Sequence, residues 1–349
     1  MKALITGGAG FIGCNLADRL ASGGAEVVVF DALTRPGVEA NLEWLQRRHG
    51  RAIQAVRSDI RDAEAVRQAA RAVDSVFHLA AQVAVTASLV DPIEDFDVNV
   101  RGALNVLEAV RPSRTPVVFA STNKVYGDLA DVPLELAEGA YRPRDAQVRA
   151  RGIGETRPLD FHSPYGCSKG AADQYMLDYA RSFGVPTCVL RMSCVYGPRQ
   201  MGTEDQGWVA HFVIRALNRE PIVIYGDGRQ VRDVLYVDDA VSAYVAAAER
   251  MPRVCGRALN LGGGPANAIS LLQLLAHIEK RLGYGIELSF DAWRQGDQRY
   301  YVTDASAAHA ALGLAGPKGW RDGVAALIDW VKAGHDGGRV LAAAAEPVA

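Results

Sequence analysis

The sequence predicts an α/β protein, with a doubly wound parallel sheet followed by a smaller, mixed α/β C-terminal lobe. Short apolar segments alternate with segments of helical periodicity through residues 2–191, which is typical of a parallel sheet covered by helices. A glycine-rich turn at 7–13 joins the first apolar segment to the first helical one. Small or polar residues follow several later strands, at the edge where such sheets bind their ligands.

The first strand, residues 2–6, leads into a turn that suits a phosphate group. Gly7, Gly10 and Gly13 let the chain turn tightly, let the backbone approach a pyrophosphate, and let the next helix pack close on the strand. That helix, which we expect to end near Ser22, would present its N-terminal amides to the phosphates. Taken alone, the motif also fits a strand-turn-helix without a ligand.

A second strand, residues 26–30, ends in Asp31. A carboxylate at this separation from a glycine turn binds the adenosine ribose hydroxyls of a dinucleotide. Because that carboxylate would repel a 2′-phosphate, we expect NAD rather than NADP. Arg35 nearby favours the opposite choice.

Two further strands continue the pattern. Residues 52–57 lead to Asp59, which is placed to meet the adenine edge. A buried strand at 75–79 ends in A-A-Q at 80–82, where small residues would let the cofactor lie against the backbone. His78 in that strand is interpreted as a buried histidine with a hydrogen-bond partner rather than as a catalyst.

Three residues carry the expected chemistry. A helix at 92–110 precedes a fifth strand at 117–120, and Thr122 follows the end of that strand. Tyr165 and Lys169 are four residues apart beside a segment of helical periodicity, so they share one face of a helix. The ammonium favours the phenolate, which lowers the tyrosine pKa from about 10 towards neutral and allows the tyrosine to act as a general base.

Composition limits the class of protein. The 349 residues are 49% hydrophobic and 22% charged, as in an ordinary soluble globular protein. The net charge of −2 gives no reason to expect nucleic acid or an anionic membrane as a partner. The five cysteines lack paired or CxxC spacing, which predicts reduced thiols, no metal site and a cytoplasmic location. Neither a signal peptide nor a membrane span is expected.

Together these motifs resemble the extended short-chain dehydrogenase/reductase family, mostly nucleotide-sugar epimerases and dehydratases on a Rossmann fold. The resemblance rests on G-x-x-G-x-x-G, the Ser/Thr after the fifth strand and Y-x-x-x-K, and it extends to about Trp330. It implies that Thr122 hydrogen-bonds the reacting sugar hydroxyl, that Tyr165 takes its proton, and that Lys169 assists the tyrosine and holds the nicotinamide ribose. The cofactor contacts that we expect are Gly7, Gly10, Phe11, Ile12, Gly13, Asp31, Asp59, Ile60, Leu79, Ala80, Ala81, Gln82, Asn99, Tyr165 and Lys169.

The second half of the chain resembles the family's substrate-binding segments. Residues 189–198 resemble the strand and loop over the sugar nucleotide, with Cys194 where the family often has Asn. Two later turns resemble phosphate-binding segments, which implies that Arg232 and Arg299 hold the diphosphate. The substrate contacts that we expect are Thr122, Asn123, Cys194, Gln200, Gln206, Tyr225, Arg232 and Arg299.

The two residues after Thr122 bear on the reaction. Nucleotide-sugar 4,6-dehydratases carry acidic residues there, which move protons during the loss of water. This chain has Asn123 and Lys124, so we expect epimerisation through transient oxidation by tightly bound NAD rather than dehydration. The blocks that resemble a narrower branch, the CDP-paratose 2-epimerases, are 121–129, 159–181, 199–200 and 205–209.

Two other interpretations stay open. One is another NAD-dependent nucleotide-sugar epimerase, acting at C4 or on a different base or sugar, because no residue identifies the base. The other is a non-catalytic Rossmann module that senses NAD. The intact Thr122 and Y-x-x-x-K argue against the second.

The expected organisation follows from these assignments. A NAD-binding domain would span 1–191 with 234–250 packed back on it, a nucleotide-sugar lobe would span 192–233 and 251–332, and a mobile tail would span 333–349. The resemblance also implies that residues 139–160 cover the substrate. In this family the helices at 92–110 and 171–183 pair across a two-fold axis, which implies a homo-oligomer, either a dimer or a tetramer.

Overall fold

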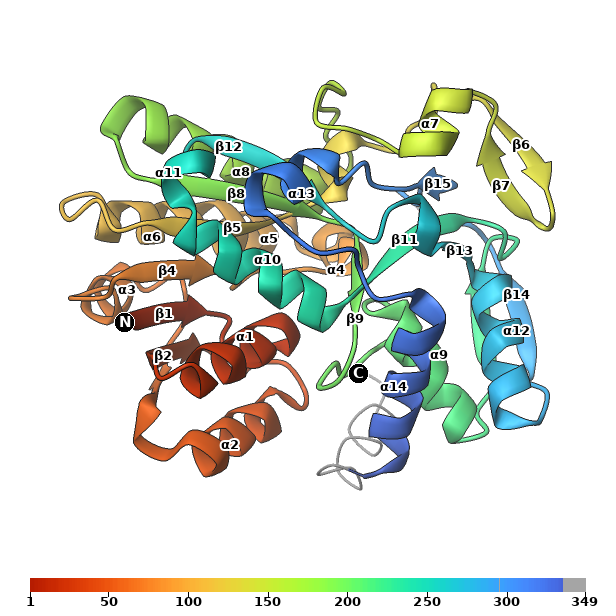
Figure 1. Cartoon of the computed structure of the whole chain (residues 1–349), viewed down its shortest axis with the longest axis horizontal. Helices are drawn as coiled ribbons and strands as arrows, with labels where there is room; N and C mark the ends of the chain where they lie inside the picture. Colours follow the sequence, from red (N-terminus) through yellow and green to blue (C-terminus); the bar gives the residue numbers. More distant parts are fainter. Residues whose placement is uncertain (295, 335–349) are drawn as a thin grey trace.

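A seven-stranded sheet forms the centre of the computed structural model, which describes residues 1–294 and 296–334 (Figure 1). Its strand order is β12-β8-β5-β4-β1-β2-β3, and every neighbouring pair runs parallel. The predicted doubly wound fold class is confirmed. The predicted tail lies outside the described residues from position 335 onward. The strands are β1 (Lys2–Thr6), β2 (Glu26–Asp31), β3 (Ile53–Arg57), β4 (Ser75–His78), β5 (Val117–Thr122), β8 (Thr187–Met192) and β12 (Arg257–Leu261).

The central strands form where branched and aromatic residues are buried on both faces of the sheet. All residues of β5, V-V-F-A-S-T, are buried, and so are the residues V-V-V-F of β2. Such continuous apolar segments are typical of parallel sheets covered on both sides. Asp31 and Thr122 are the last residues of these two strands, so both lie at the carboxyl edge of the sheet.

Helices cover both faces of the sheet (Figure 1). On one face, α1, α2, α10, α11 and α13 pack around a core that includes Leu16 and Tyr244. On the other, α3, α6 and α8 pack around a core that includes Val106 and Met176. These helices are α1 (Phe11–Ser22), α2 (Val38–His49), α3 (Ala63–Ala69), α6 (Gly102–Val110), α8 (Ser163–Phe183), α10 (Val237–Glu249), α11 (Met251–Val254) and α13 (Ser306–Leu312); the 3-10 turn η1 (Gly50–Ala52) follows α2.

Helix α8 begins before the helical periodicity does, so it contains both Tyr165 and Lys169. Pro164 lies in its first turn, where a missing amide hydrogen costs no helical hydrogen bond. Gly184 ends the helix with φ +65°, a left-handed conformation that glycine adopts without strain. Among the described helices, none combines the length and the apolar character that crossing a membrane requires.

The segment expected as one helix at 92–110 changes its winding. Helix α5 (Pro92–Phe96) runs into a π-helical segment, η2 (Asp97–Arg101), before α6 begins. Such segments inside helices frequently lie at functional sites. Helix α4 (Val85–Val90) precedes them, and both α4 and α5 pack against α8.

The smaller lobe is built around β11, which pairs with β9, β13 and β15. Strands β10 and β14 form a separate parallel pair, and α9, α12 and α14 share a core with these strands. Ser270 and Gln273 form a capping box at the start of α12. These elements are β9 (Cys194–Tyr196), α9 (Trp208–Leu217), β10 (Ile222–Tyr225), β11 (Val231–Tyr236), η4 (Pro265–Asn267), β13 (Ala268–Ser270), α12 (Leu271–Leu282), β14 (Leu288–Asp291), β15 (Tyr300–Tyr301) and α14 (Trp320–Lys332).

Two expected boundaries differ from the structure. We expected residues 251–332 to belong to the lobe, but β12 is the seventh strand of the main sheet and α13 packs on that sheet. Pairing with β12 satisfies the backbone groups of β8, which would otherwise be an open edge. Residues 139–160, expected as an irregular loop, contribute to a hairpin of β6 (Leu134–Ala137) and β7 (Ala140–Pro143) and to α7 (Ala146–Arg151).

The buried histidine of β4 is a structural residue. His78 is 1% exposed, its Nδ1 lies 2.7 Å from the Thr6 hydroxyl, and its ring stacks on Phe119 with centroids 5.4 Å apart. Burial lowers the pKa of His78 from 6.5 to about 3. Between these values the unfolded chain binds a proton that the folded protein does not, so folding stability falls as the pH falls through this window.

We therefore predict that His78→Asn reduces the acid sensitivity of the fold, because the amide can still bond Thr6 but does not titrate. Between pH 7 and 4.5 the parent should lose about 2–3 kcal/mol more stability than the variant. Urea unfolding at both pH values measures this difference. An equal loss of folding stability in the parent and in His78→Asn would contradict the assignment of His78 as a buried histidine that resists protonation.

Candidate active site

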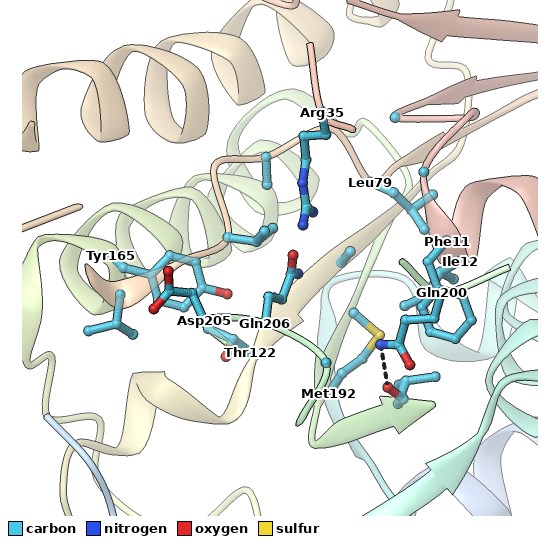
Figure 2. A pocket seen from close by; sticks show the side chains of 18 of the residues that line it. Phe11, Ile12, Arg35, Leu79, Thr122, Tyr165, Met192, Gln200, Asp205 and Gln206 are labelled. Carbon is cyan, nitrogen blue, oxygen red and sulfur yellow. Dashed lines mark hydrogen bonds between the residues drawn. The ribbon is translucent and has the colours of Figure 1, made fainter. Parts of the chain in front are cut away.

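A cavity of about 640 Å³ opens at the carboxyl edge of the main sheet and extends into the lobe. Figure 2 shows Phe11 and Ile12 on one side of it, with Tyr165 and Thr122 on the other. Tyr225 of the lobe lines it as well. The cavity therefore brings together the glycine turn, the tyrosine–lysine helix and the lobe, which are far apart in the sequence.

The glycine turn packs as closely as the motif predicts. A Cβ on Gly13 would lie 2.2 Å from the Gly7 carbonyl oxygen, so only glycine allows this contact between helix and strand. Gly7 has φ +68°, and a Cβ there would lie 2.7 Å from the Ala80 nitrogen. Helix α1 has Gly10 as its N-cap and no side chain capping its amides. Its first amides can therefore bind a pyrophosphate.

Asp31 is held in place at the end of β2. Its Oδ2 accepts a hydrogen bond from the Ala9 amide at 3.0 Å, and its Oδ1 accepts one from the Leu33 amide at 2.9 Å. Arg35 lines the same cavity, and burial lowers its pKa despite the opposing effect of the Asp31 carboxylate. Asp31, which favours NAD, and Arg35, which favours NADP, thus lie in one site.

The rest of the expected cofactor set divides into lining and supporting residues. Asp59 and Ile60 line the cavity, as do Leu79, Ala80 and Ala81. The hydrogen bond from Arg61 to Asp59 lowers the pKa of that carboxyl.

Gln82 and Asn99, expected as direct contacts, are not among the lining residues. Their amide groups bond to Asp95 behind the wall, at 3.0 and 3.1 Å. Their side chains therefore support the site without facing the cavity.

Thr122, Tyr165 and Lys169 lie together as expected, from the end of β5 and the first turns of α8. All three are buried, with exposures of 8%, 8% and 3%. Thr122 hydrogen-bonds Tyr165, and the Lys169 ammonium lies over the Phe119 ring, 4.3 Å from its centroid. This arrangement can bind a hydroxyl group and move its proton.

The sequence analysis predicted a lowered pKa for Tyr165, and the structure shows that this prediction is wrong. Burial raises the pKa of Tyr165 to about 12, and the hydrogen bond with Thr122 only partly offsets this. Burial also lowers the pKa of Lys169 from 10.5 to about 7, so at neutral pH this lysine carries only part of a charge. The spacing showed that the two side chains share a helix face, but it did not show that both are removed from water.

Most of the expected substrate residues line the cavity. Arg232 is buried at 8% exposure, and its guanidinium donates to the Gln298 and Val231 carbonyls at 2.5 and 2.9 Å. Arg299 is not among the lining residues. Its guanidinium lies instead over Tyr141 and Trp293, 5.7 and 5.4 Å from the ring centroids. The other expected substrate residues that line the cavity are Asn123, Cys194, Gln200, Gln206 and Tyr225.

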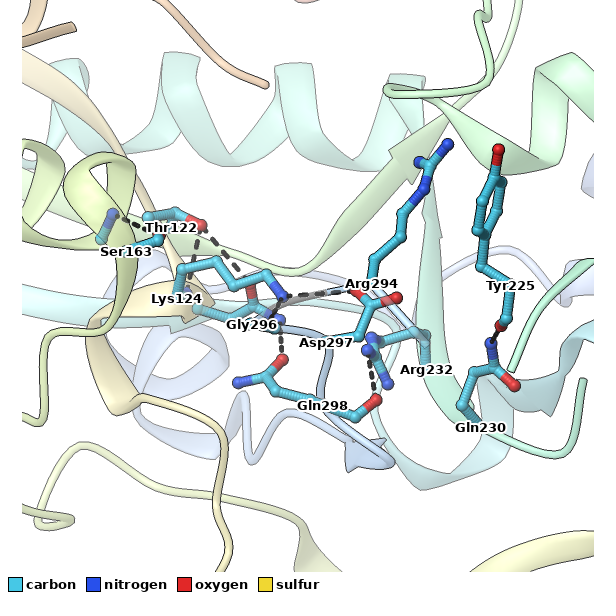
Figure 3. Close-up of polar contacts among 12 residues, drawn as sticks. Thr122, Lys124, Ser163, Tyr225, Gln230, Arg232, Arg294, Gly296, Asp297 and Gln298 are labelled. Atoms are coloured by element: carbon cyan, nitrogen blue, oxygen red, sulfur yellow. Dashed lines mark hydrogen bonds and ion pairs between the residues drawn. The ribbon is translucent and has the colours of Figure 1, made fainter. Parts of the chain in front are cut away.

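Arg294 is a cavity residue that sequence reasoning missed. Its guanidinium lies 3.7 Å from the centroid of the Tyr225 ring and pairs with Glu204 and Asp205 at 3.5 and 3.3 Å, as Figure 3 shows for Arg294 beside Tyr225. The sequence offered two arginines on either side of Gly296, and the resemblance pointed to Arg299. Of these two arginines, Arg294 is the one that lines the cavity.

Lys124 connects the two halves of the site (Figure 3). Its ammonium donates to the Gly296 carbonyl at 2.9 Å and lies 4.0 Å from Asp297, both from the lobe. Burial and the nearby Arg232 lower the pKa of Lys124 to about 8. The position that holds an acid in dehydratases therefore holds a cation that ties the sheet edge to the lobe.

The segment expected to cover the substrate does not contact the cavity. None of residues 139–160 is among its lining residues, whereas Glu204, Asp205, Gln206 and Gly207 are. The turn before α9 therefore covers the cavity in this structure, and the expectation for 139–160 is wrong.

Comparisons with known proteins agree with this geometry. The model of the NAD dependent epimerase/dehydratase family matches residues 3–262. This chain belongs to that family. The CDP-paratose 2-epimerase of Salmonella typhi is 43% identical over 95% of this chain and 99% of that protein. A putative UDP-glucose 4-epimerase of Methanocaldococcus jannaschii is 31% identical over 94% of this chain and 98% of that protein.

Solved structures of the same family share the fold. A UDP-glucose 4-epimerase of Thermotoga maritima, solved with UDP-glucose, has a TM-score of 0.82 and 31% identity over 95% of this chain and 99% of that one. A UDP-glucuronic acid 4-epimerase of Bacillus cereus, solved with UDP-glucuronic acid and NAD, has the same TM-score and 28% identity over the same shares. The chain is thus a nucleotide-sugar epimerase/dehydratase by family and by fold.

Proposed function

We propose that this protein is a cytoplasmic NAD-dependent epimerase that inverts C2 of a nucleotide sugar, in a reaction of the type CDP-paratose to CDP-tyvelose. The observation that carries the proposal is its 43% identity, over almost the whole chain, with a CDP-paratose 2-epimerase. The site adds support, because Asn123 and Lys124 follow Thr122 where a dehydratase needs acids. The buried cavity also contains an intact Tyr165 and Lys169.

The residues present fit NAD. The uncapped amides of α1 and the tight Gly7–Gly13 contact make a pyrophosphate cradle that a Cβ would fill. The Asp31 carboxylate would hold the adenosine ribose, and Asp59 would meet the adenine. Bound NAD would accept a hydride from the sugar and return it to the opposite face of the ring, and its oxidised form would add positive charge to the cavity.

The chain's own residues handle the proton and the substrate. Thr122 would hydrogen-bond the C2 hydroxyl, and Tyr165 would take its proton and later give it back. The sugar would pass through a 2-keto form. It would then rotate in the site, so that the opposite face of the ring meets the cofactor, while its diphosphate stays bound. Because the cofactor ends each cycle in the state in which it began, we expect it to stay bound between turnovers.

Arg232 and Arg294 would hold that diphosphate. Both guanidinium groups line the cavity on the lobe side, and guanidinium binds phosphate oxygens in pairs. Arg294 pairs with the Glu204 and Asp205 carboxylates, so a diphosphate would replace these two as its partner.

A second candidate is a C4 epimerase. The 4-epimerases from Methanocaldococcus jannaschii and Thermotoga maritima, both about a third identical, favour it. The two reactions use the same proton acceptor and the same cofactor, and they differ in which hydroxyl lies at Tyr165. The product therefore distinguishes them.

The first of three predictions on the proposed function is that purified protein converts CDP-paratose to its C2 epimer without added cofactor. Proton NMR measures this conversion. In deuterated water the product should carry no deuterium at C2, because the same hydrogen returns. Tyr165→Phe should lower the rate by about 10²–10⁴, whereas Tyr284→Phe, at a lobe tyrosine that is not among the cavity's lining residues, should not.

Two results would count against the C2 proposal. No turnover even with NAD added would reject this substrate, and a panel of UDP-, GDP- and dTDP-hexoses would then test the C4 alternative. Deuterium at C2 of the product would reject the return of the same hydride.

The second prediction concerns the two arginines of the 294–299 turn. Arg294→Gln should raise KM for the nucleotide sugar about 10–100-fold, because a charge-assisted contact with the diphosphate is lost. Arg299→Gln removes the same charge from a side chain that lies over Trp293 outside the cavity, and should change KM much less. The opposite ranking would restore the assignment made from the sequence.

We also expect a homo-oligomer. An apolar surface on α4, α5 and α8 consists of Leu89, Val90, Ile93, Phe96 and Tyr175, which are 41–87% exposed. Exposed apolar groups gathered on packed helices are typical of a protein interface. Two copies would bury this surface by packing the same helices together, as the family resemblance implies.

The third prediction tests this interface. Ile93→Asp places a charge in the middle of the apolar surface and should shift the protein to a smaller species in sedimentation velocity. Leu136→Asp, at an exposed position on β6, should leave the assembly unchanged. A monomeric parent protein would reject the interface.

A further inference from the structure

Asp95 is a buried carboxylate that the proposed mechanism does not use. It lies on α5 with 0% exposure. Its Oδ1 accepts hydrogen bonds from the side-chain amides of Gln82 and Asn99 at 3.0 and 3.1 Å. Its Oδ2 is also buried and has no partner at hydrogen-bond distance among the described residues. Burial raises the pKa of Asp95, and the nearby Ser168 hydroxyl and Lys169 ammonium oppose this rise. A buried carboxylate with only neutral donors is costly, so its surroundings require an explanation.

Asp95 is one of two buried carboxylates that act on Lys169. The other, Asp173, is on the same helix as Lys169 and is also 0% exposed. Arg191 neutralises Asp173 through two hydrogen bonds of 2.8 and 2.9 Å, and the Ser121 hydroxyl adds a third. Asp95 has no such cation of its own within the described part of the chain. Asp173 has the larger effect on the pKa of Lys169, and Lys169 is in turn the cation that favours the charged form of Asp95.

A network of amides and hydroxyls holds Asp95 against the tyrosine–lysine helix. The Asn99 amide that bonds Asp95 also lies 3.0 Å from the Ser168 hydroxyl, and that hydroxyl donates to the Tyr165 carbonyl at 3.2 Å. Asn99 is part of the π-helical segment η2. The irregular winding thus has a consequence at the site, because it joins α5 to α8 behind the cavity wall.

We propose that Asp95 is a positioning residue for the reaction: its carboxylate is a counter-charge that favours the ammonium form of the Lys169 side chain beside Tyr165. This inference rests on the proposed function, since it assigns Lys169 a role in that reaction. It also gives Gln82 and Asn99 a function, which is to orient the carboxylate.

The electrostatics of the site agree in sign. Burial lowers the pKa of Lys169 to about 7, while Asp173 and Asp95 raise it. Burial raises the pKa of Tyr165 to about 12, and Asp95 adds to that increase. Removing the charge of Asp95 should therefore lower the pKa of both groups, and both limbs of a pH profile should move in the same direction.

The other titratable groups around the lysine do not change in such a variant. Apart from Asp95, the described groups whose charge is coupled to that of the lysine are Asp173 on α8 and His78 on β4, and Arg191 on β8 pairs with Asp173. Beside Asp95, Glu94 pairs with Arg61 and Asp97 pairs with Arg101 at the surface.

The test is Asp95→Asn. The amide oxygen can still accept from Gln82 and Asn99, and the added NH₂ replaces an oxygen that has no partner. The measurement is kcat/KM for CDP-paratose epimerisation against pH, with both limbs expected about one unit lower than in the parent. Asp97→Asn removes a charge two residues away that is partly exposed and paired with Arg101, and its profile should match the parent's.

A second measurement does not depend on turnover. Trace labelling with acetic anhydride at a series of pH values, read by mass spectrometry of the peptide that contains Lys169, gives the pKa of that amine directly. Asp95→Asn should lower the midpoint of labelling, and Asp97→Asn should not. If Asp95→Asn does not fold, Asp95→Ser removes the same charge and carries the same expectation.

The outcomes separate this inference from the proposed function. Turnover of CDP-paratose with unshifted limbs in Asp95→Asn, or a lower rate without a shift, would overturn the role of Asp95 while the epimerase proposal stands. No turnover by the parent together with a lower Lys169 midpoint in the variant would reject the substrate and support the counter-charge.

Discussion

The buried ion pair between Arg191 and Asp173 holds helix α8, which carries Tyr165 and Lys169, in its place. Its side chains are 5% and 0% exposed, and it joins β8 to α8. Arg191 also donates a hydrogen bond to the Tyr126 hydroxyl, which in turn donates one to Asn260 on β12. The Arg191 side chain thereby connects α8 to the outermost strand of the sheet. Removing one partner from such a pair costs about 3–5 kcal/mol, because the other charge stays buried alone. The positions of Tyr165 and Lys169 relative to Thr122 depend on this contact.

Burial has opposite effects on the charges of the site. It lowers the pKa of Lys169 to about 7 and that of Lys124 to about 8, and it raises the pKa of Tyr165 to about 12. Burial therefore favours the uncharged form of each of these three side chains. A carboxylate such as Asp95 has a large effect in these surroundings, because little water is present to screen it.

Local patterns predicted the parts of the site that depend on local geometry. The glycine turn, Asp31 after the second strand, and Thr122 after the fifth all line the cavity, since a strand end or a tight turn determines where such residues lie. Arg299 was assigned to the cavity and Arg294 was not, because both flank one turn and only the folded path of the chain decides which one points inward. The seventh strand was missed for a similar reason, as its partner β8 lies far away in the sequence.

The sequence by itself predicted the α/β class and the nucleotide-binding motif. It also predicted that Thr122, Tyr165 and Lys169 belong to one site. These predictions depend on periodicity, glycine conformation and helical spacing. Tertiary structure alone decided how those groups ionise. The pKa of Tyr165 is raised and not lowered, since the helix is buried and water is excluded from both partners. Tertiary structure also placed Asp95 and Arg294, whose roles depend on neighbours from distant segments. Burial and long-range contact are properties of the packed molecule, and no short stretch of sequence contains them.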